Sequence, residues 1–362
     1  MNEDRSSRYQ RLKRQASIAS VAWTLVLLAG LLLSGASLIL RNLAGDGAFA
    51  IVFYVGLLLL LNELGGLPLA FYSGFLLERR YGLSEEPLGR WIADQAKAFA
   101  IGLVLSSIGA AIVYALIRLS PERWWLSAAA VFALLIVGLT NLAPVLLLPL
   151  FYRVKPLERE DLRVRLLRLA DRAGAKVLGA YEWGLSEKTR KANAALAGLG
   201  STRRILVSDT MLAEYTDEEI EVVLAHELAH HVHGDIWKGI VFESLLILAG
   251  FYLASRALAG FAPSFGLRGV ADIAGLPLLV LAAGAVSFVM VPVAHAMSRA
   301  YERSADRFAL TLTRNPDAFI SAMKRLAAQN LAEEHPSKLV QWLFYSHPPV
   351  RERIEAARAF QS

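Results

Sequence analysis

The chain contains no cysteine among its 362 residues. This absence excludes disulfides, cysteine-ligated zinc, iron–sulfur clusters and thiol catalysis. Charged residues are also scarce, at 19% against 55% hydrophobic residues, and the mean hydropathy is +0.43. Soluble globular domains carry about a quarter charged residues, so this composition argues against a soluble enzyme as well as against a disordered chain.

The net charge of +6 comes without basic and aromatic residues interleaved in one patch. We therefore expect no nucleic acid partner. In a membrane protein, an excess of lysine and arginine more often sets the orientation in the bilayer.

Long apolar runs alternate with charged segments. Six runs reach or approach the length of about 20 residues that a helix needs to cross a bilayer. They cover residues 15–40, 48–77, 98–117, 124–152, 239–258 and 275–297. The first run is too long for a signal peptide and predicts an uncleaved anchor. Buried core helices are the alternative, strongest for the second and fourth runs, which contain polar residues or prolines.

Lysine and arginine are dense at the amino terminus and in alternate loops between the runs. By the positive-inside rule, both termini and both hydrophilic blocks should be cytoplasmic, facing inward from the inner membrane if the host is bacterial. The division that follows is a four-span region (1–152), a first hydrophilic part (153–238), two further spans (239–297) and a second hydrophilic part (298–362). Asn62, Glu63, Asn141 and Glu243 lie within spans, where such residues face a cavity or each other.

The first hydrophilic block reads as a small α+β unit. A helical pattern surrounds residues 162–170, β character surrounds 177–183, and residues 204–208 read as a short strand. Thr216 then has the position of an N-cap, with Glu219 in the capping-box position, so a helix should begin there.

That helix contains His226-Glu227-Leu228-Ala229-His230, a His-Glu-x-x-His motif. On a helix, residues four apart share one face, so both imidazoles can reach one zinc ion while Glu227 holds the attacking water. The alternative is a helix whose histidines only face solvent. His233 is a weaker candidate ligand one turn further on.

The second block supplies a candidate third ligand. Glu302 and Asp306 are four residues apart in a segment of helical propensity. Glu302 can complete a site that keeps one position open for water, and Asp306 can hydrogen-bond a ligating imidazole. The spacing alone supports equally well the alternative that both residues are surface carboxylates beside neighbouring arginines.

These motifs together resemble the M48 metallopeptidases, and within them the Ste24-type CAAX prenyl proteases. The similarity rests on the His-Glu-x-x-His motif, on the Glu302-x-x-x-Asp306 pair and on further segments at 78–83, 149–151, 193–200, 207–212 and 346–354. It implies an all-α integral membrane protein of about six transmembrane helices with a cytoplasmic gluzincin-type α+β metalloprotease domain carrying a small sheet. It also implies one Zn²⁺ per chain and a water-filled chamber among the helices.

The resemblance assigns roles to four more residues. Asn193 and Ala194 are implied to lie along the bound peptide, and His347 and Arg353 to face the scissile bond. Two features depart from the family pattern. We count six spans where the eukaryotic enzymes have seven, and Asn193-Ala194-Ala195 stands where the family has Asn-Ala-Tyr.

The hypothesis is therefore an integral membrane zinc endopeptidase that uses a zinc-activated water with Glu227 as general base. Its expected partners are the lipid bilayer and a peptide or protein substrate that is membrane-embedded, or prenylated and CAAX-like. A quality-control protease for membrane proteins is an alternative. So are a non-proteolytic metal-binding scaffold and a soluble hydrolase tethered by a single span.

Overall fold

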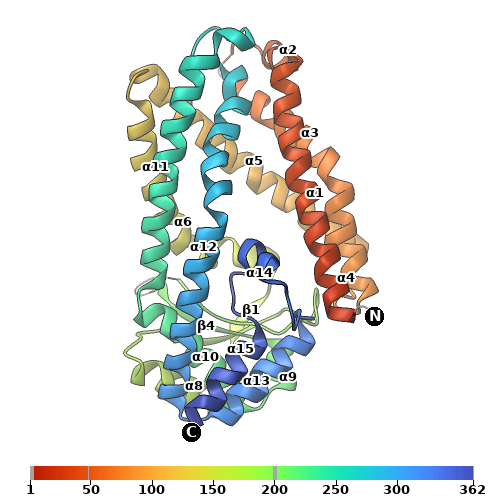
Figure 1. Ribbon diagram of the computed structural model, residues 1–362, viewed down its shortest axis with the longest axis vertical. Coiled ribbons are helices and arrows are strands. Elements are labelled where there is room, and N and C mark those ends of the chain that lie inside the picture. The colour runs from red at the N-terminus through yellow and green to blue at the C-terminus, as the bar shows by residue number, and fades with distance from the viewer. Residues whose placement is uncertain (1–3, 48, 199–201, 362) are drawn as a thin grey trace.

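A bundle of long helices stands on a smaller domain of helices and one sheet (Figure 1). The computed structural model describes residues 4–47, 49–198 and 202–361. Ala48, with which the second apolar run begins, and Leu199 and Gly200 of the 193–200 segment lie outside these ranges.

Within the described residues, six helices are long and apolar enough to span a membrane, which confirms the expected number. The first four belong to the amino-terminal region and the last two follow the first catalytic segment. Their elements are α1 (Arg5–Leu33), α3 (Ala50–Phe71) continuing through a π-helical turn (Tyr72–Leu76) into α4 (Leu77–Arg80), α5 (Leu88–Leu119), α6 (Trp124–Leu146) with α7 (Leu148–Phe151), α11 (Asp235–Phe261) and α12 (Leu276–Thr313).

The first apolar run is not one helix. It breaks after α1, and a short helix α2 (Ala36–Ala44) follows at an angle. The break lies at Gly35, whose φ of +74° is the left-handed conformation that glycine adopts without steric cost. The run of 15–40 therefore contains a span and the start of a surface helix.

The spans pack tightly at the end far from the small domain. Tyr54, Tyr114 and Trp124 are fully buried there, together with apolar residues of α11 and α12. Nearer the small domain, α1 leans away from α12, and α14 (Lys338–Phe344) lies between them in the view of Figure 1. At most 22% of the most apolar window of any span is buried, so the outer faces leave a large apolar surface for lipid.

Two of the polar residues within spans have hydrogen-bond partners. The Asn62 side-chain oxygen accepts from the Thr24 hydroxyl at 3.0 Å, which links α3 to α1. The Asn141 oxygen accepts from the Thr202 hydroxyl at 2.9 Å, which links α6 to the small domain. Both asparagines therefore bond to hydroxyl groups of neighbouring elements, and not to the other polar residues named within the spans.

The sheet has four strands in the order β1-β2-β4-β3. They are β1 (Val154–Pro156), β2 (Ala180–Trp183), β3 (Ala194–Ala197) and β4 (Arg204–Ser208), the last with the bounds that the sequence predicts. β2 and β4 are parallel, and the other pairs are antiparallel. β3 lies at one edge, so no other strand of the described residues pairs with its outer side.

The helices α8 (Glu160–Arg172), α9 (Asp209–Glu214) and α10 (Asp217–Val232) pack on this sheet. The helices α13 (Pro316–Gln329) and α15 (Val350–Gln361) pack on each other, and α13 also contacts α10. Leu166, Ile205, Ile220, Leu224 and Phe319 form the centre of the core. It joins the two catalytic segments that the sequence separates, because α10 comes from the first and α13 from the second. The predicted divisions at 238 and 297 fall inside α11 and α12, so both helices continue past them.

Candidate metal centre

The α10 helix begins as the sequence predicts. The Thr216 hydroxyl accepts from the Glu219 backbone N–H at 3.3 Å, and the Glu219 carboxylate accepts from the Thr216 N–H at 2.9 Å. This capping box sets the helical register of the following residues. His226 and His230 consequently lie one turn apart, with their Nε2 atoms 3.3 Å from each other.

The α12 helix packs on α10 and brings Glu302 to the two imidazoles. Glu302 Oε2 lies 3.2 Å from His226 Nε2, and Oε1 lies 3.4 Å from His230 Nε2. One potential ligand atom from each residue falls within 4.8 Å of the others. The surface-carboxylate reading is thus excluded for Glu302, which is 5% exposed.

These three residues fit a metal ion by their chemistry. Among the described residues, none donates a hydrogen bond to the buried Glu302 Oε2, although two imidazoles are close to it. A buried carboxylate oxygen without a donor is costly unless it meets a cation. Two imidazoles and one carboxylate form a donor set of catalytic zinc sites, with a fourth position left open.

Each imidazole has a carboxylate at its other nitrogen. His226 Nδ1 lies 2.9 Å from Asp306 Oδ1, as the sequence predicts for Asp306. His230 Nδ1 lies 3.0 Å from Asp235 Oδ2, a contact that sequence reasoning missed. Such contacts fix the ring orientation and the tautomer that can bind a metal through Nε2. Gly234 is the sequence feature from which this contact could have been predicted. Its left-handed turn starts α11 and brings Asp235, the first residue of that helix, back toward His230.

Arg353 holds Asp306 in place. Its Nε and Nη2 atoms donate to the two Asp306 oxygens at 2.8 and 2.6 Å, a paired contact in a buried setting. Burial opposes the charge on the guanidinium, but Asp306 raises the Arg353 pKa overall. The resemblance implies that Arg353 faces the scissile bond. Its guanidinium pairs with Asp306 and also lines the cavity that opens onto the centre.

The carboxylates around His226 favour a positive charge on its imidazole. Burial acts to lower the pKa of His226, but the contacts with Asp306 and Glu302 outweigh it and raise that pKa to about 9. Burial raises the pKa of Glu227, the residue between the two imidazoles. A carboxylate with a raised pKa is a better proton acceptor at neutral pH than one in water.

A cavity of about 370 Å³ opens onto the centre. The expected substrate and catalytic residues meet along its walls, namely Asn193, Ala194, Glu227, His347 and Arg353. His347 is 61% exposed, and its Nδ1 lies 2.8 Å from Glu302 Oε2. His233 lies apart from the cluster, where it contacts Ser304 and Phe308.

The open edge of β3 forms part of the same wall. The Ser208 N–H donates to the Asn193 carbonyl at 2.9 Å, so Asn193 bonds to the β4 side. Antiparallel strands alternate the direction of their backbone groups, so Ala195 also faces β4 while Ala194 and Leu196 direct theirs outward. An extended peptide can add to this edge as a further strand.

The loop that carries His347 is fixed by two arginines. Arg299 on α12 donates to the Tyr345 carbonyl at 2.6 Å. Arg14 on α1 donates to the Tyr345 hydroxyl at 2.9 Å and to Glu333 at 2.5 Å. The first membrane helix therefore contacts a wall of the cavity directly.

A helix with two histidines and a glutamate, a carboxylate from a second helix and a bundle of six spans define a membrane-bound metallopeptidase. The chain belongs to peptidase family M48, whose family model matches residues 156–361. Residues 2–153 match the model described as "CAAX prenyl protease N-terminal, five membrane helices". In the described part of that region, four helices qualify as spans.

Curated relatives extend the similarity along most of the chain. The uncharacterized metalloprotease YhfN of Bacillus subtilis is 33% identical over an alignment of 310 residues that covers 84% of this chain and 72% of that protein. CAAX prenyl protease 1 of Saccharomyces cerevisiae is 28% identical over an alignment of 330 residues that covers 84% of this chain and 71% of that one. The crystal structure of S. mikatae Ste24p has the same fold, with a TM-score of 0.88, 24% identity and coverage of 97% of this chain and 88% of that one.

Proposed function

We propose that this metallopeptidase uses one zinc ion to hydrolyse peptide bonds of membrane-associated or lipidated, CAAX-like substrates. The observation that carries the proposal is the cluster of His226, His230 and Glu302 beside Glu227, in a cavity bordered by an open strand edge. The names of the yeast, plant and animal relatives support the choice of substrate.

The proposed ligands are His226, His230 and Glu302. A zinc ion held by them would supply a Lewis acid that polarises the scissile carbonyl and lowers the pKa of a water molecule. Glu227 would take the proton of the attacking water and pass it to the leaving amine. Its partly buried position between the two ligands, on the wall of the cavity, supports this role.

The other wall residues would bind and orient the peptide. The outward backbone groups of Ala194, next to Asn193, would hydrogen-bond an extended substrate with little demand on its sequence. The exposed His347 would donate to the developing oxyanion. We assign Arg353 a positioning role instead, since its contact with Asp306 fixes His226.

We place both termini and the catalytic domain on the cytoplasmic side. The dense basic residues before and after the spans support this orientation, since such residues remain in the cytoplasm. Single cysteines introduced into this cysteine-free chain would test it by their accessibility to an impermeant thiol reagent. An impermeant reagent added to intact cells should not label a cysteine near position 8. Labelling of that cysteine only after the membrane is permeabilised would support the orientation.

The direct test compares full-length protein in detergent with the variant Glu227→Gln. About one zinc per chain in both proteins, with cleavage of a quenched peptide by the wild type alone, is the expected result. Zinc in both and equal cleavage would overturn the role of Glu227. Zinc in both and no cleavage of either prenylated or plain peptides would favour a metal-binding scaffold.

A quality-control protease for membrane proteins is the second candidate. It is favoured by the β3 edge, because an edge strand binds a peptide through backbone hydrogen bonds that do not depend on the side chains of the peptide. Farnesylated and unfarnesylated forms of one peptide separate the two. A much higher kcat/KM for the farnesylated form supports the CAAX-like substrate, and equal values support quality control.

A further inference from the structure

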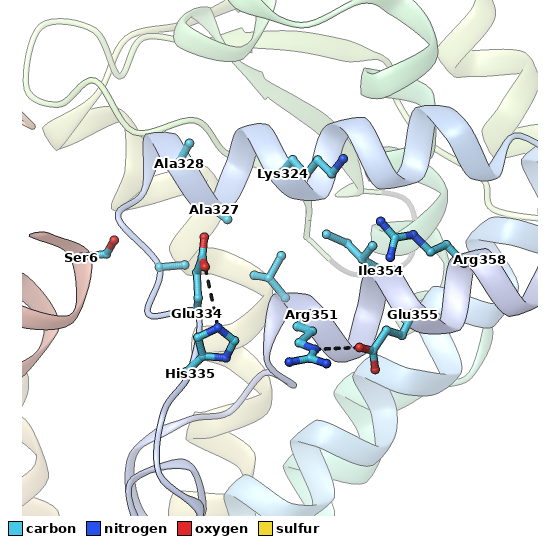
Figure 2. A pocket seen from close by; sticks show the side chains of 12 residues that line it. Ser6, Lys324, Ala327, Ala328, Glu334, His335, Arg351, Ile354, Glu355 and Arg358 are labelled. Carbon is cyan, nitrogen blue, oxygen red and sulfur yellow. Dashed lines mark hydrogen bonds and ion pairs between the residues drawn. The ribbon is translucent and has the colours of Figure 1, made fainter. Parts of the chain in front are cut away.

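Clefts open on the surface at both ends of the molecule. One runs between α13 and α15 on the outer face of the catalytic domain (Figure 2). Ala327, Ala332 and Val350 line both this cleft and the catalytic cavity, so it continues the site already described. The other has a volume of about 550 Å³ and lies at the opposite end, beside α2, where the spans end (Figure 1). We call it the distal cleft.

The distal cleft is lined by charged residues and glycines. It lies between α2, the start of α3, the end of α5 and the loop that joins α11 to α12. The space over three of its glycines is open: Gly45, Gly47 and Gly269. Three arginines and two aspartates line it: Arg41, Arg118 and Arg268, with Asp46 and Asp272. The arginines therefore exceed the aspartates by one positive charge.

The two aspartates are already engaged. Asp272 Oδ2 accepts from Arg41 Nη1 at 2.5 Å and from the Arg268 backbone N–H at 2.8 Å. The Asp272 side chain is 1% exposed, so its oxygens face the protein. Asp46, which is 84% exposed, lies 3.2 Å from the Arg268 guanidinium. Among the described residues, no carboxylate lies within ion-pair distance of the exposed Arg118, so its charge is available to a ligand.

The position of Arg118 along α5 sets the depth of the cleft in a bilayer. Lys97 and Arg118 bound the uncharged stretch 98–117 of this helix. About 20 helical residues with a rise of 1.5 Å each reach about 30 Å, enough to cross the hydrocarbon core. The Lys97 end lies at the catalytic domain, because Lys188 of that domain pairs with Asp94 one turn earlier. Arg118 therefore lies at the headgroup layer of the opposite leaflet.

The elements that form the cleft also carry exposed apolar side chains. Ile39 and Leu43 lie one turn apart on α2 and are largely exposed, while Arg41 of the same helix turns inward to Asp272. Leu119, next to Arg118, is also largely exposed. Apolar side chains beside a basic cleft suit a ligand with a charged head and acyl chains, and not a free ion in water.

We propose that the distal cleft binds the phosphate of an anionic phospholipid through Arg118 and Arg268. Guanidinium groups bind phosphate by charge-assisted hydrogen bonds. An anionic headgroup fits better than a zwitterionic one, because the cleft has an excess of positive charge and its exposed carboxylate, Asp46, is paired. The lipid would bridge α5 and the loop that precedes α12, and so hold the ends of the membrane helices together.

The test is native mass spectrometry of full-length protein in a nonionic detergent, titrated with phosphatidylglycerol or with phosphatidylcholine of the same acyl chains. Phosphatidylglycerol should bind more tightly. Replacing both Arg118 and Arg268 by glutamine should weaken its binding by about 2- to 30-fold, the range for two exposed ion pairs, and remove the preference over phosphatidylcholine. Thermal unfolding without added lipid should be unchanged, because both side chains are exposed.

The matched control replaces Arg123 and Arg256 by glutamine. Both are exposed and lie at the same end of the bundle, neither lines the cleft, and the net charge falls by the same amount. An equal loss in the control would overturn the proposal, as would equal binding of the two lipids by the unmodified protein. Glycerol phosphate, which lacks acyl chains, separates a lipid from a free phosphate. Displacement of phosphatidylglycerol by an equal concentration of glycerol phosphate would overturn the assignment to a lipid.

Discussion

The contact between Asp235 and His230 gives the sharpest test of the metal centre. Asp235 is 8% exposed, and its Oδ2 lies 3.0 Å from His230 Nδ1. Replacement by asparagine keeps the size of the side chain and an oxygen that can accept from the ring. It removes the negative charge that makes the imidazole a stronger metal ligand.

Loss of such a contact costs about 10- to 100-fold in metal affinity. This corresponds to about 1.4–2.7 kcal/mol of binding free energy. The effect on folding should be smaller, because Asp235 also acts as an acidic residue at the start of α11, a role worth about 0.3–1 kcal/mol. We therefore expect Asp235→Asn to weaken zinc binding clearly while the protein stays folded.

The assay is competition for zinc between full-length protein and a chelator of known affinity. The control is Lys238→Met, which removes the other partner of Asp235, bound at 2.8 Å and 48% exposed. This variant should bind zinc as the wild type does. An unchanged zinc Kd in Asp235→Asn would refute the reasoning. An equal loss in both variants would show that the ion pair with Lys238, and not the contact with His230, supports the site.

Three further outcomes follow from the same geometry. Arg353→Lys keeps the charge but not the paired contact with Asp306, so zinc affinity should fall about 10-fold in the chelator assay; an unchanged Kd would contradict the positioning role. Ala194→Pro removes an outward N–H from the β3 edge and should raise KM for peptides by about 2- to 12-fold at similar kcat, whereas an unchanged KM argues against strand addition. Zinc at about 100 times its Kd should stabilise the wild type and Glu227→Gln alike by about 2.7 kcal/mol in thermal unfolding; the same stabilisation of His226→Ala would remove His226 from the ligand set.

Local signals made parts of this structure predictable. The capped helix that carries His226 and His230 follows from Thr216 and the helical period, and β4 follows from its run of β-branched and apolar residues. The spans follow from hydropathy, because a bilayer demands length and apolarity without regard to partners. Each of these features is decided within about 20 residues of sequence.

Long-range contacts could not be found in this way. Arg353 meets Asp306 across 47 positions, and Arg14 meets Glu333 across 319. No periodicity links such residues; only the packed fold brings them together. The edge position of β3 is similarly hidden, because strand order depends on which pairs form in space.

The membrane helices take part in the geometry of the metal centre. α12 is a single helix of 38 residues that continues from an apolar span into the segment with Glu302 and Asp306. On the other side, Arg14 near the base of α1 holds the loop of His347. Arg299 of α12 holds the same loop through the Tyr345 carbonyl. The position of His347 beside Glu302 therefore depends on contacts from both spans, and replacing either arginine should loosen the loop against the centre.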